Sequence, residues 1–154
     1  MSNWIKERAD AVRIAEKEQK EELERKAGAA RDLKRQLDPF WQELVDVLSR
    51  CVKQFNFEFP ETNRKIDEFE KPSSDTVMIR RTAYPAVSVK AQLNNAGTTV
   101  QYSISRIQRK GVNAAEKQAS FSYTVTNGKI AYSDPALGSH EDVAKMLLDA
   151  FFEF

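Results

Sequence analysis

Residues 86–105, AVSVKAQLNNAGTTVQYSIS, decide the fold class, because apolar and polar side chains alternate on both sides of a turn. Alternation with a period of two is typical of a strand with one buried and one solvated face. The central Asn94-Asn95-Ala96-Gly97 has the composition of a turn. The stretch therefore predicts two antiparallel strands, at 86–93 and 98–108, that are joined as a hairpin.

The same alternation continues before and after this hairpin. Asn127-Gly128 is a strong hairpin signal and separates two further alternating stretches. The pattern predicts strands at residues 76–82, 86–93, 98–108, 119–126 and 129–133. Phe55, Phe57 and Phe59 also alternate up to Pro60, which favours a short edge strand there. Residues 61–75 are mostly polar, and their pattern leaves helix and strand both open.

Helices are predicted on both sides of these strands in the chain. Asp38-Pro39 has the composition of a helix start, with a capping aspartate followed by a proline, and the next apolar residues have a helical period. Ser139 predicts the N-cap of a last helix. We therefore expect an α+β domain over residues 37–154. It comprises a second amphipathic helix, a four- to five-stranded antiparallel meander with one wet face, and a C-terminal helix packed on the sheet. The order of the strands in space stays open.

Residues 1–36 have a different character and are predicted to form a long charged helix. From residue 3 to residue 36 there is no proline, Gly28 is the one glycine, and strong helix formers dominate. Opposite charges lie four residues apart at Glu16/Lys20, Lys17/Glu21, Glu21/Arg25 and Glu22/Lys26. Such a helix is roughly 50 Å long, whereas a small domain is about 30 Å across. It therefore either extends from the body as an arm or breaks near Gly28.

A heptad pattern runs along this helix. Its positions are Ile5, Ala9, Val12, Glu16, Gln19, Leu23, Lys26, Ala30, Leu33 and Leu37. The pattern is apolar at both ends and polar in the middle, so it does not indicate a uniform coiled coil. Trp4 and Ile5, at the start of the helix, need a surface that buries them. We predict that they bind a second copy of the chain or another protein.

Overall composition argues against several classes of partner. The 154 residues carry a net charge of +1, which gives no broad electrostatic attraction to nucleic acid or to a membrane. The longest apolar runs are a few residues, too short to span a bilayer. Charges lie where a signal peptide needs apolar residues, and Cys51 is the single cysteine. These features predict a cytoplasmic protein without a membrane segment.

Basic residues of the strands form a candidate anion-binding patch. Arg80 and Lys90 share the parity of the wet face, and Arg109 and Lys110 follow the strand at 98–108. Sheets that bind single-stranded RNA also present aromatic rings on the binding face, and here the aromatic residues have the opposite parity. Nucleic acid is therefore disfavoured as a partner. Weak binding of nucleic acid through the basic strand ends remains one alternative.

Side chains that carry chemistry are few. Zinc sites in proteins need several His or Cys ligands, and this chain has one of each. We expect His140 to be a surface residue at a helix start and Cys51 to pack in the core. The sequence therefore predicts no catalytic residue, no metal site and no cofactor.

These observations favour a non-enzymatic interaction module. Its charged helix would serve for self-association or for docking of a protein partner, so a homo-oligomer is expected. A small apolar-ligand binder or enzyme, with a cavity between sheet and helices, is a second alternative.

Overall fold

The computed structural model describes residues 3–154, which divide into two units. One unit ends at Gln36 and the other is Leu37–Phe154. The expectation that residues 1–36 extend beyond the body stays a prediction.

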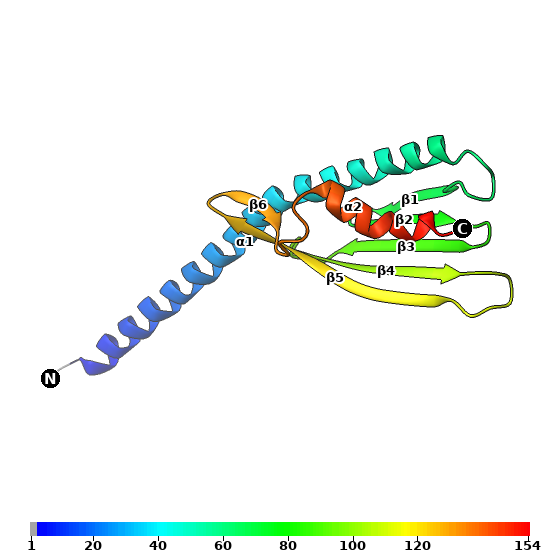
Figure 1. The fold of residues 1–154 in the computed structure, drawn as a ribbon. Helices are drawn as coiled ribbons and strands as arrows, with labels where there is room; N and C mark the ends of the chain where they lie inside the picture. The colour runs from blue at the N-terminus through cyan, green and yellow to red at the C-terminus, as the bar shows by residue number, and fades with distance from the viewer. Residues whose placement is uncertain (1–2) are drawn as a thin grey trace. The chain divides into compact units, whose positions relative to one another are not determined.

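The chain forms an α+β fold with a six-stranded antiparallel sheet (Figure 1). The elements are α1 Trp4–Glu58, β1 Glu68–Ser73, β2 Thr76–Arg81, β3 Ala86–Leu93, β4 Thr99–Ile107, β5 Ala115–Thr126, β6 Lys129–Tyr132, α2 His140–Leu148 and the 3-10 helix η1 Asp149–Phe152. Each strand pairs with the next one in the chain, so the order in space is β1-β2-β3-β4-β5-β6. The predicted α+β class and antiparallel meander are confirmed, but the predicted count of four to five strands is wrong.

β1 is the strand that the sequence pattern missed. It lies in the stretch 61–75, where helix and strand were both open, and it pairs with β2 through contacts such as Phe69 with Ile79. Four of its six residues are exposed, because it is an edge strand with little apolar surface to bury. A strand of this kind carries no alternation of apolar and polar residues, so its sequence has no period to detect.

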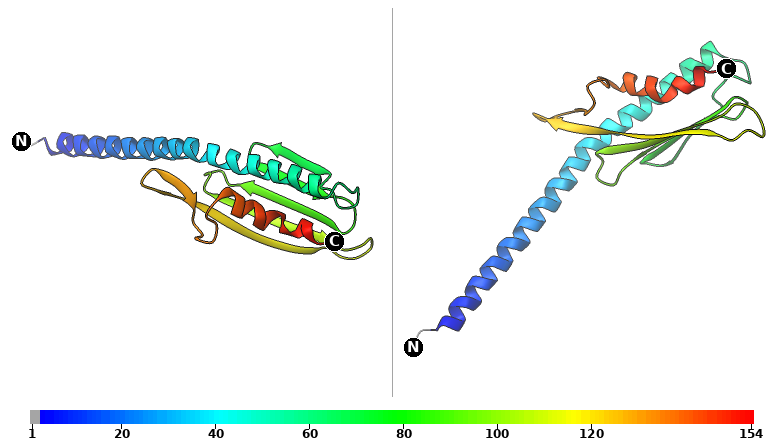
Figure 2. Two further views of the ribbon diagram at one scale, coloured as in Figure 1. Left: turned by 45° about the horizontal axis from the view of Figure 1, so that its top comes forward. Right: turned by 60° about the horizontal axis from the view of Figure 1, so that its bottom comes forward.

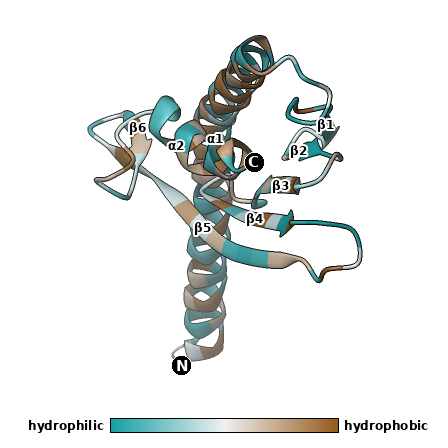
Figure 3. Cartoon of the chain, turned by 45° about the vertical axis from the view of Figure 1, so that its right-hand side comes forward, coloured by the Kyte–Doolittle hydropathy of each residue, from teal (hydrophilic) through white to brown (hydrophobic). Residues whose placement is uncertain are grey.

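The core lies on one face of the sheet. The register aligns Val89 of β3 with Ile79 of β2 and Ile104 of β4, and all three side chains are buried. The second half of α1 and α2 lie on the same side of the sheet (Figure 2). Hydrophobic and hydrophilic residues alternate in bands along the strands (Figure 3). One face of the strands is therefore apolar and covered by helices, and the other is polar.

The predicted helix start at Asp38-Pro39 is wrong, because α1 continues through both Gly28 and Pro39. Proline has no N–H, so the carbonyl of Arg35 lacks its usual helical donor. Arg35 and Pro39 are both exposed, and water can satisfy this carbonyl. An interior proline costs about 3 kcal/mol. Burial of the flanking Leu37 and Trp41, at roughly 1.5–3 kcal/mol for each large apolar side chain, offsets this cost.

The short strand predicted from Phe55, Phe57 and Phe59 is also wrong. The N–H of Phe59 donates to the carbonyl of Phe55 at 2.8 Å, which is a helical contact. A spacing of four residues places these two rings on one face of α1, and their centroids are 4.9 Å apart. Phe57 lies on the other side of the helix and is 79% exposed. Alternating phenylalanines therefore fit a helix end as well as a strand.

Two polar contacts join α1 to the segments that follow it. The indole N–H of the buried Trp41 donates to the carbonyl of Ser74 in the β1–β2 turn at 2.9 Å. The Asn56 side chain accepts from the N–H of Ile66 at 2.7 Å and donates to the carbonyl of the same residue at 2.9 Å. These bonds hold the β1–β2 hairpin and the chain before it against the helix.

Arg81 is a charged side chain inside the core. It is 1% exposed and lies at the end of β2, on the face that carries Val77 and Ile79. Its guanidinium donates to four backbone carbonyls, those of Pro85 at 3.0 Å, Arg64 at 3.2 Å, Phe151 at 2.7 Å and Glu153 at 2.9 Å. One side chain thereby joins the turn before β1, the turn after β2 and the C-terminal segment.

We predict that Arg81→Met destabilises the domain by about 3 kcal/mol or more, because it leaves several carbonyls without donors at about 1–3 kcal/mol each. Urea denaturation of the full chain measures this loss. Arg80→Met is the matched control, because Arg80 is partly exposed and its loss is expected to cost less than about 1 kcal/mol. Equal losses in the two variants would contradict the role given to Arg81.

Candidate functional site

The four basic residues predicted to bind anions do not form one patch. Arg80 lies within 2.9 Å of Glu68 and 3.4 Å of Glu70, both on the neighbouring strand β1. The contact with Glu68 has the distance of an ion pair without an aligned hydrogen bond. The guanidinium therefore already has two carboxylate partners, and its charge is largely compensated.

Lys90 shares the polar face with Arg80, but Arg109 and Lys110 lie elsewhere. Lys90 is exposed in the middle of β3, where it pairs with Ser103 of β4. Arg109 follows the end of β4, six residues beyond Ser103, which is roughly 20 Å along a strand. Of the four predicted residues, the structure therefore places only Lys90 as an exposed charge on the polar face of the sheet, and it places Arg109 and Lys110 in a separate loop.

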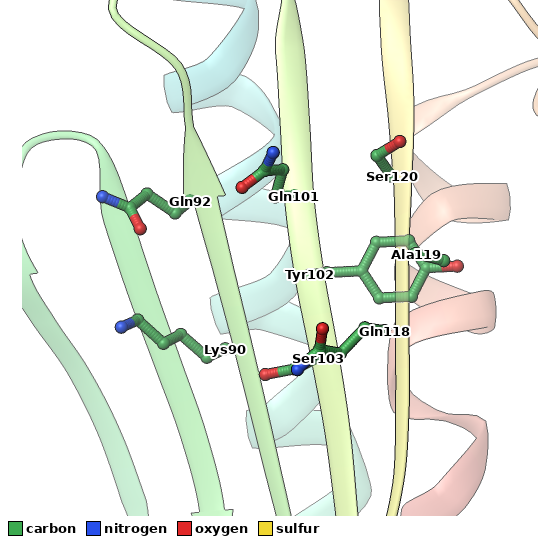
Figure 4. Close-up of a pocket in the computed structure, with 8 residues that line it drawn as sticks. All are labelled: Lys90, Gln92, Gln101, Tyr102, Ser103, Gln118, Ala119 and Ser120. Carbon is green, nitrogen blue, oxygen red and sulfur yellow. The ribbon is translucent and has the colours of Figure 1, made fainter.

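A shallow polar pocket of about 450 Å³ surrounds Lys90 on the polar face of the sheet (Figure 4). Its side chains come from β3, β4 and β5 in two rows set by the strand register: Gln92, Gln101 and Ser120 in one, and Lys90, Ser103 and Gln118 in the other. Tyr102 also borders the pocket, but its hydroxyl donates to Met146 Sδ of α2 at 3.7 Å, on the covered side. Amides, hydroxyls and one ammonium group suit a small polar ligand, and they give little surface for base stacking.

An apolar groove of about 290 Å³ lies between the second half of α1 and the α2–η1 segment. Its apolar lining consists of Cys51, Phe55, Phe59, Ala144, Leu148 and Phe152. The rings of Phe55 and Phe152 are 5.0 Å apart, and Phe152 is 56% exposed. This groove lies between the helices, whereas the alternative function considered from the sequence placed a cavity between sheet and helices.

Cys51 is half-buried in this groove, so the expectation of a core cysteine holds only in part. Burial raises the pKa of the Cys51 thiol, and the nearby carboxylate of Glu141 raises it further. The side chain is therefore a thiol at neutral pH, whereas nucleophilic attack requires the thiolate. The geometry makes Cys51 a lining residue of the apolar groove.

His140 is not a plain surface residue, because its ring joins two other side chains. Tyr132 Oη lies 2.6 Å from His140 Nδ1, and His140 Nε2 lies 3.1 Å from Glu43 Oε2. Burial raises the pKa of Tyr132, with smaller contributions from Tyr123 and Glu43, so the Tyr132 hydroxyl keeps its proton. This hydroxyl therefore donates to Nδ1, and Nε2–H donates to Glu43.

This Tyr132–His140–Glu43 chain connects β6, α2 and α1. The ring of Phe40 also lies against His140, with centroids 4.4 Å apart. Neither the polar pocket nor the apolar groove is lined by Tyr132 or His140. The arrangement thus positions the end of the sheet against the helices. No sequence pattern predicted this arrangement, because Glu43 lies far from the other two residues in the chain and a loop separates Tyr132 from His140.

Tyr123 is buried beside Tyr132, the first residue of the hydrogen-bonded Tyr132–His140–Glu43 series. Its hydroxyl has no hydrogen-bond partner within residues 3–154, and burial raises the pKa of the group. An unpaired buried hydroxyl is costly, at about 1–3 kcal/mol on mutational scales.

Within residues 3–154, no three His, Cys, Asp or Glu side chains come together in a way that could hold a metal ion. Over the same residues no helix combines the length and hydrophobicity needed to cross a bilayer. Comparisons with protein-family models, curated proteins and solved structures find no match to this chain.

We predict that the stability of the domain falls as pH rises above about 10, where unfolded tyrosines begin to lose their protons. Tyr123 and Tyr132 have raised pKa values in the folded state, so the unfolded chain releases these protons first and is favoured. Their contribution to stability is complete below this pH and declines above it. Urea denaturation from pH 7 to pH 11 measures the decline.

Tyr123→Phe and Tyr132→Phe should each reduce this alkaline loss, whereas Tyr84→Phe, at a 47% exposed position, should leave it unchanged. At pH 7 Tyr123→Phe and Tyr132→Phe should have different effects on the free energy of unfolding. Tyr123→Phe removes an unpaired hydroxyl and should be neutral or stabilising, whereas Tyr132→Phe leaves His140 without its donor and should destabilise. An unchanged alkaline loss in both variants would contradict the assignment.

Proposed function

We propose that this protein is a non-enzymatic interaction module that self-associates through the helical residues 4–36. The observation that carries the proposal is the exposure of large apolar side chains along this helix. Trp4, Ile5, Val12, Ile14 and Leu23 are each more than half exposed. Apolar surface on a helix is stabilised when a partner covers it.

The charged residues of this helix supply little internal stability. Of the four predicted ion pairs with a spacing of four residues, only Glu22 with Lys26 comes within 4 Å, at 3.9 Å. Glu22 also pairs with Arg25 at 2.6 Å. Exposed pairs of this kind contribute about 0.2–1 kcal/mol each. Association with a partner would add the burial of apolar residues to these small contributions.

The remaining features are consistent with a protein that binds rather than catalyses. Cys51 is held as a thiol, and His140 is engaged by Tyr132 and Glu43. A single cysteine, unpaired in the described part of the chain, also fits a reducing compartment such as the cytoplasm.

We predict that the full chain is a dimer or larger oligomer by light scattering, and that Val12→Lys or Leu23→Lys weakens it about 100-fold. Each variant removes roughly 1.5 kcal/mol or more of burial from each of two copies. Ile14→Lys is the matched control, because Ile14 is equally exposed but lies off the heptad face that holds Val12 and Leu23. A chain that is monomeric at every concentration would contradict the proposal.

A second candidate function is favoured by the apolar groove. Its volume of about 290 Å³ and its aromatic lining fit a small apolar ligand. The half-buried Cys51 lies in the lining, so the rate of its alkylation reports whether the groove is occupied.

We predict that the neutral fluorophore N-phenyl-1-naphthylamine binds this groove and slows alkylation of Cys51 by N-ethylmaleimide. Phe152→Ala should weaken binding at least about 10-fold, because it removes a ring from the lining. Phe57→Ala is the control, because this phenylalanine is more exposed and does not line the groove. An alkylation rate that the fluorophore leaves unchanged would contradict this function.

A further inference from the structure

The face through which residues 4–36 would self-associate can be defined residue by residue. We call it the seam: Ile5, Ala9, Val12, Glu16, Gln19, Leu23, Lys26, Ala30 and Leu33. These positions alternate in steps of four and three along α1, so they lie on one side of the helix. Two of them are charged. Glu16 and Lys26 would each lie in the interface between two helices, where an uncompensated charge is costly.

The two charges decide between the two orientations of a second copy. In a parallel pair each seam residue faces its own copy, so Glu16 meets Glu16 and Lys26 meets Lys26. Like charges at an interface cost several kcal/mol. In an antiparallel pair centred on Glu21, Glu16 meets Lys26 of the second copy, because both lie five residues from the centre. The two-fold symmetry forms this ion pair twice.

The same antiparallel register also matches side-chain sizes. It places Ala9 against Leu33 and Val12 against Ala30 of the second copy. A small residue faces a larger one in both layers, which lets the helices approach evenly. Near the centre, Gln19 faces Leu23 of the second copy, a pairing less favourable than two apolar residues. The orientation is thus favoured by charge at two layers and by side-chain size at four more, because two-fold symmetry forms each pairing twice.

Both charged seam residues are available to a partner. Glu16 is exposed and forms no ion pair within residues 3–154. Lys26 is 70% exposed and lies 3.9 Å from Glu22, whose carboxylate is already held by Arg25 at 2.6 Å. Forming a pair between two copies would therefore break no strong contact within one copy.

Besides the Gln19–Leu23 layers, residues that flank the seam near the two-fold axis oppose association. Lys20 flanks the seam beside Gln19, and it would lie near Lys20 of the second copy close to the two-fold axis. Flanking lysines keep their ammonium groups in water, where the interaction between two exposed charges is only about 0.2–1 kcal/mol, so their repulsion is weak. This cost is smaller than that of two like-charge contacts inside the seam of a parallel pair.

We infer that the partner of this helix is a second copy of the chain, bound antiparallel in the register that joins Glu16 of each copy to Lys26 of the other. The inference rests on the proposed function, and it adds the orientation and the register. Glu16 and Lys26 are then the residues that select the partner and its direction.

Charge reversal in the full chain tests the orientation. Glu16→Lys alone or Lys26→Glu alone should raise the dissociation constant about 100-fold, because each turns both ion pairs into like-charge contacts. The double variant Glu16→Lys/Lys26→Glu restores two opposite-charge pairs and should recover the affinity. In a parallel dimer all three variants keep two like-charge contacts, so their dissociation constants would equal that of the unmodified chain. Sedimentation equilibrium measures all four proteins.

Disulfide formation gives a second measurement, made in the full chain with Cys51→Ser. Val12→Cys/Ala30→Cys in one chain should form a covalent dimer on mild oxidation, because the two positions face each other between copies. Neither single cysteine variant should form one in the antiparallel register. In a parallel pair each single variant would cross-link with its own copy.

The outcomes separate the two proposals. Weakening by the single charge reversals, recovery in the double variant and cross-linking of the cysteine pair alone would support the antiparallel dimer. Dissociation constants that the charge reversals leave unchanged, or cross-linking of the single cysteine variants, would overturn the antiparallel dimer. Self-association itself would then still hold. A chain that remains monomeric throughout would overturn both.

Discussion

The Arg81 guanidinium is the point at which separate segments of the Leu37–Phe154 unit meet. A guanidinium that is 1% exposed must find hydrogen-bond acceptors within the protein, and Arg81 finds four carbonyl oxygens. Two of these carbonyls belong to the C-terminal segment. If α2 and η1 left the sheet, the guanidinium would lose these two acceptors or become exposed to solvent. The apolar face of the sheet supplies the burial, and Arg81 sets where the last segment of the chain closes over it.

α1 and α2 cover that face, and polar contacts around its edge hold them in place. Trp41 and Asn56 hold the first hairpin and the turn before it against α1, and the Tyr132–His140–Glu43 chain holds the other end of the sheet. His140 and Cys51 have the side chains that most often take part in catalysis. Both are held in states that suit structure better than catalysis, because one is saturated with hydrogen bonds and the other is kept protonated by burial.

α1 changes its surroundings along its length while it remains one helix. Eight of its residues from Leu37 onward are buried, whereas the residues from Trp4 to Arg31 are exposed apart from the half-buried Ala9 and Gly28. A helix whose apolar residues remain in water gains stability when a partner covers them. For this reason the proposed self-association rests on the exposed half of α1, and the charges of Glu16 and Lys26 would select the orientation of a second copy.

The sequence by itself determined the elements that have a strong period. The strands from Thr76 to Tyr132, the Asn127-Gly128 turn and the Ser139 cap follow from local backbone preference and from one-sided burial, which act over a few residues. Tertiary structure decided the rest: the edge strand β1, the passage of α1 through Pro39, the burial of Arg81, the Tyr132–His140–Glu43 chain and the apolar groove. Each of these depends on contacts between residues far apart in the chain, and the free energy of such contacts can exceed the local preferences that sequence patterns report.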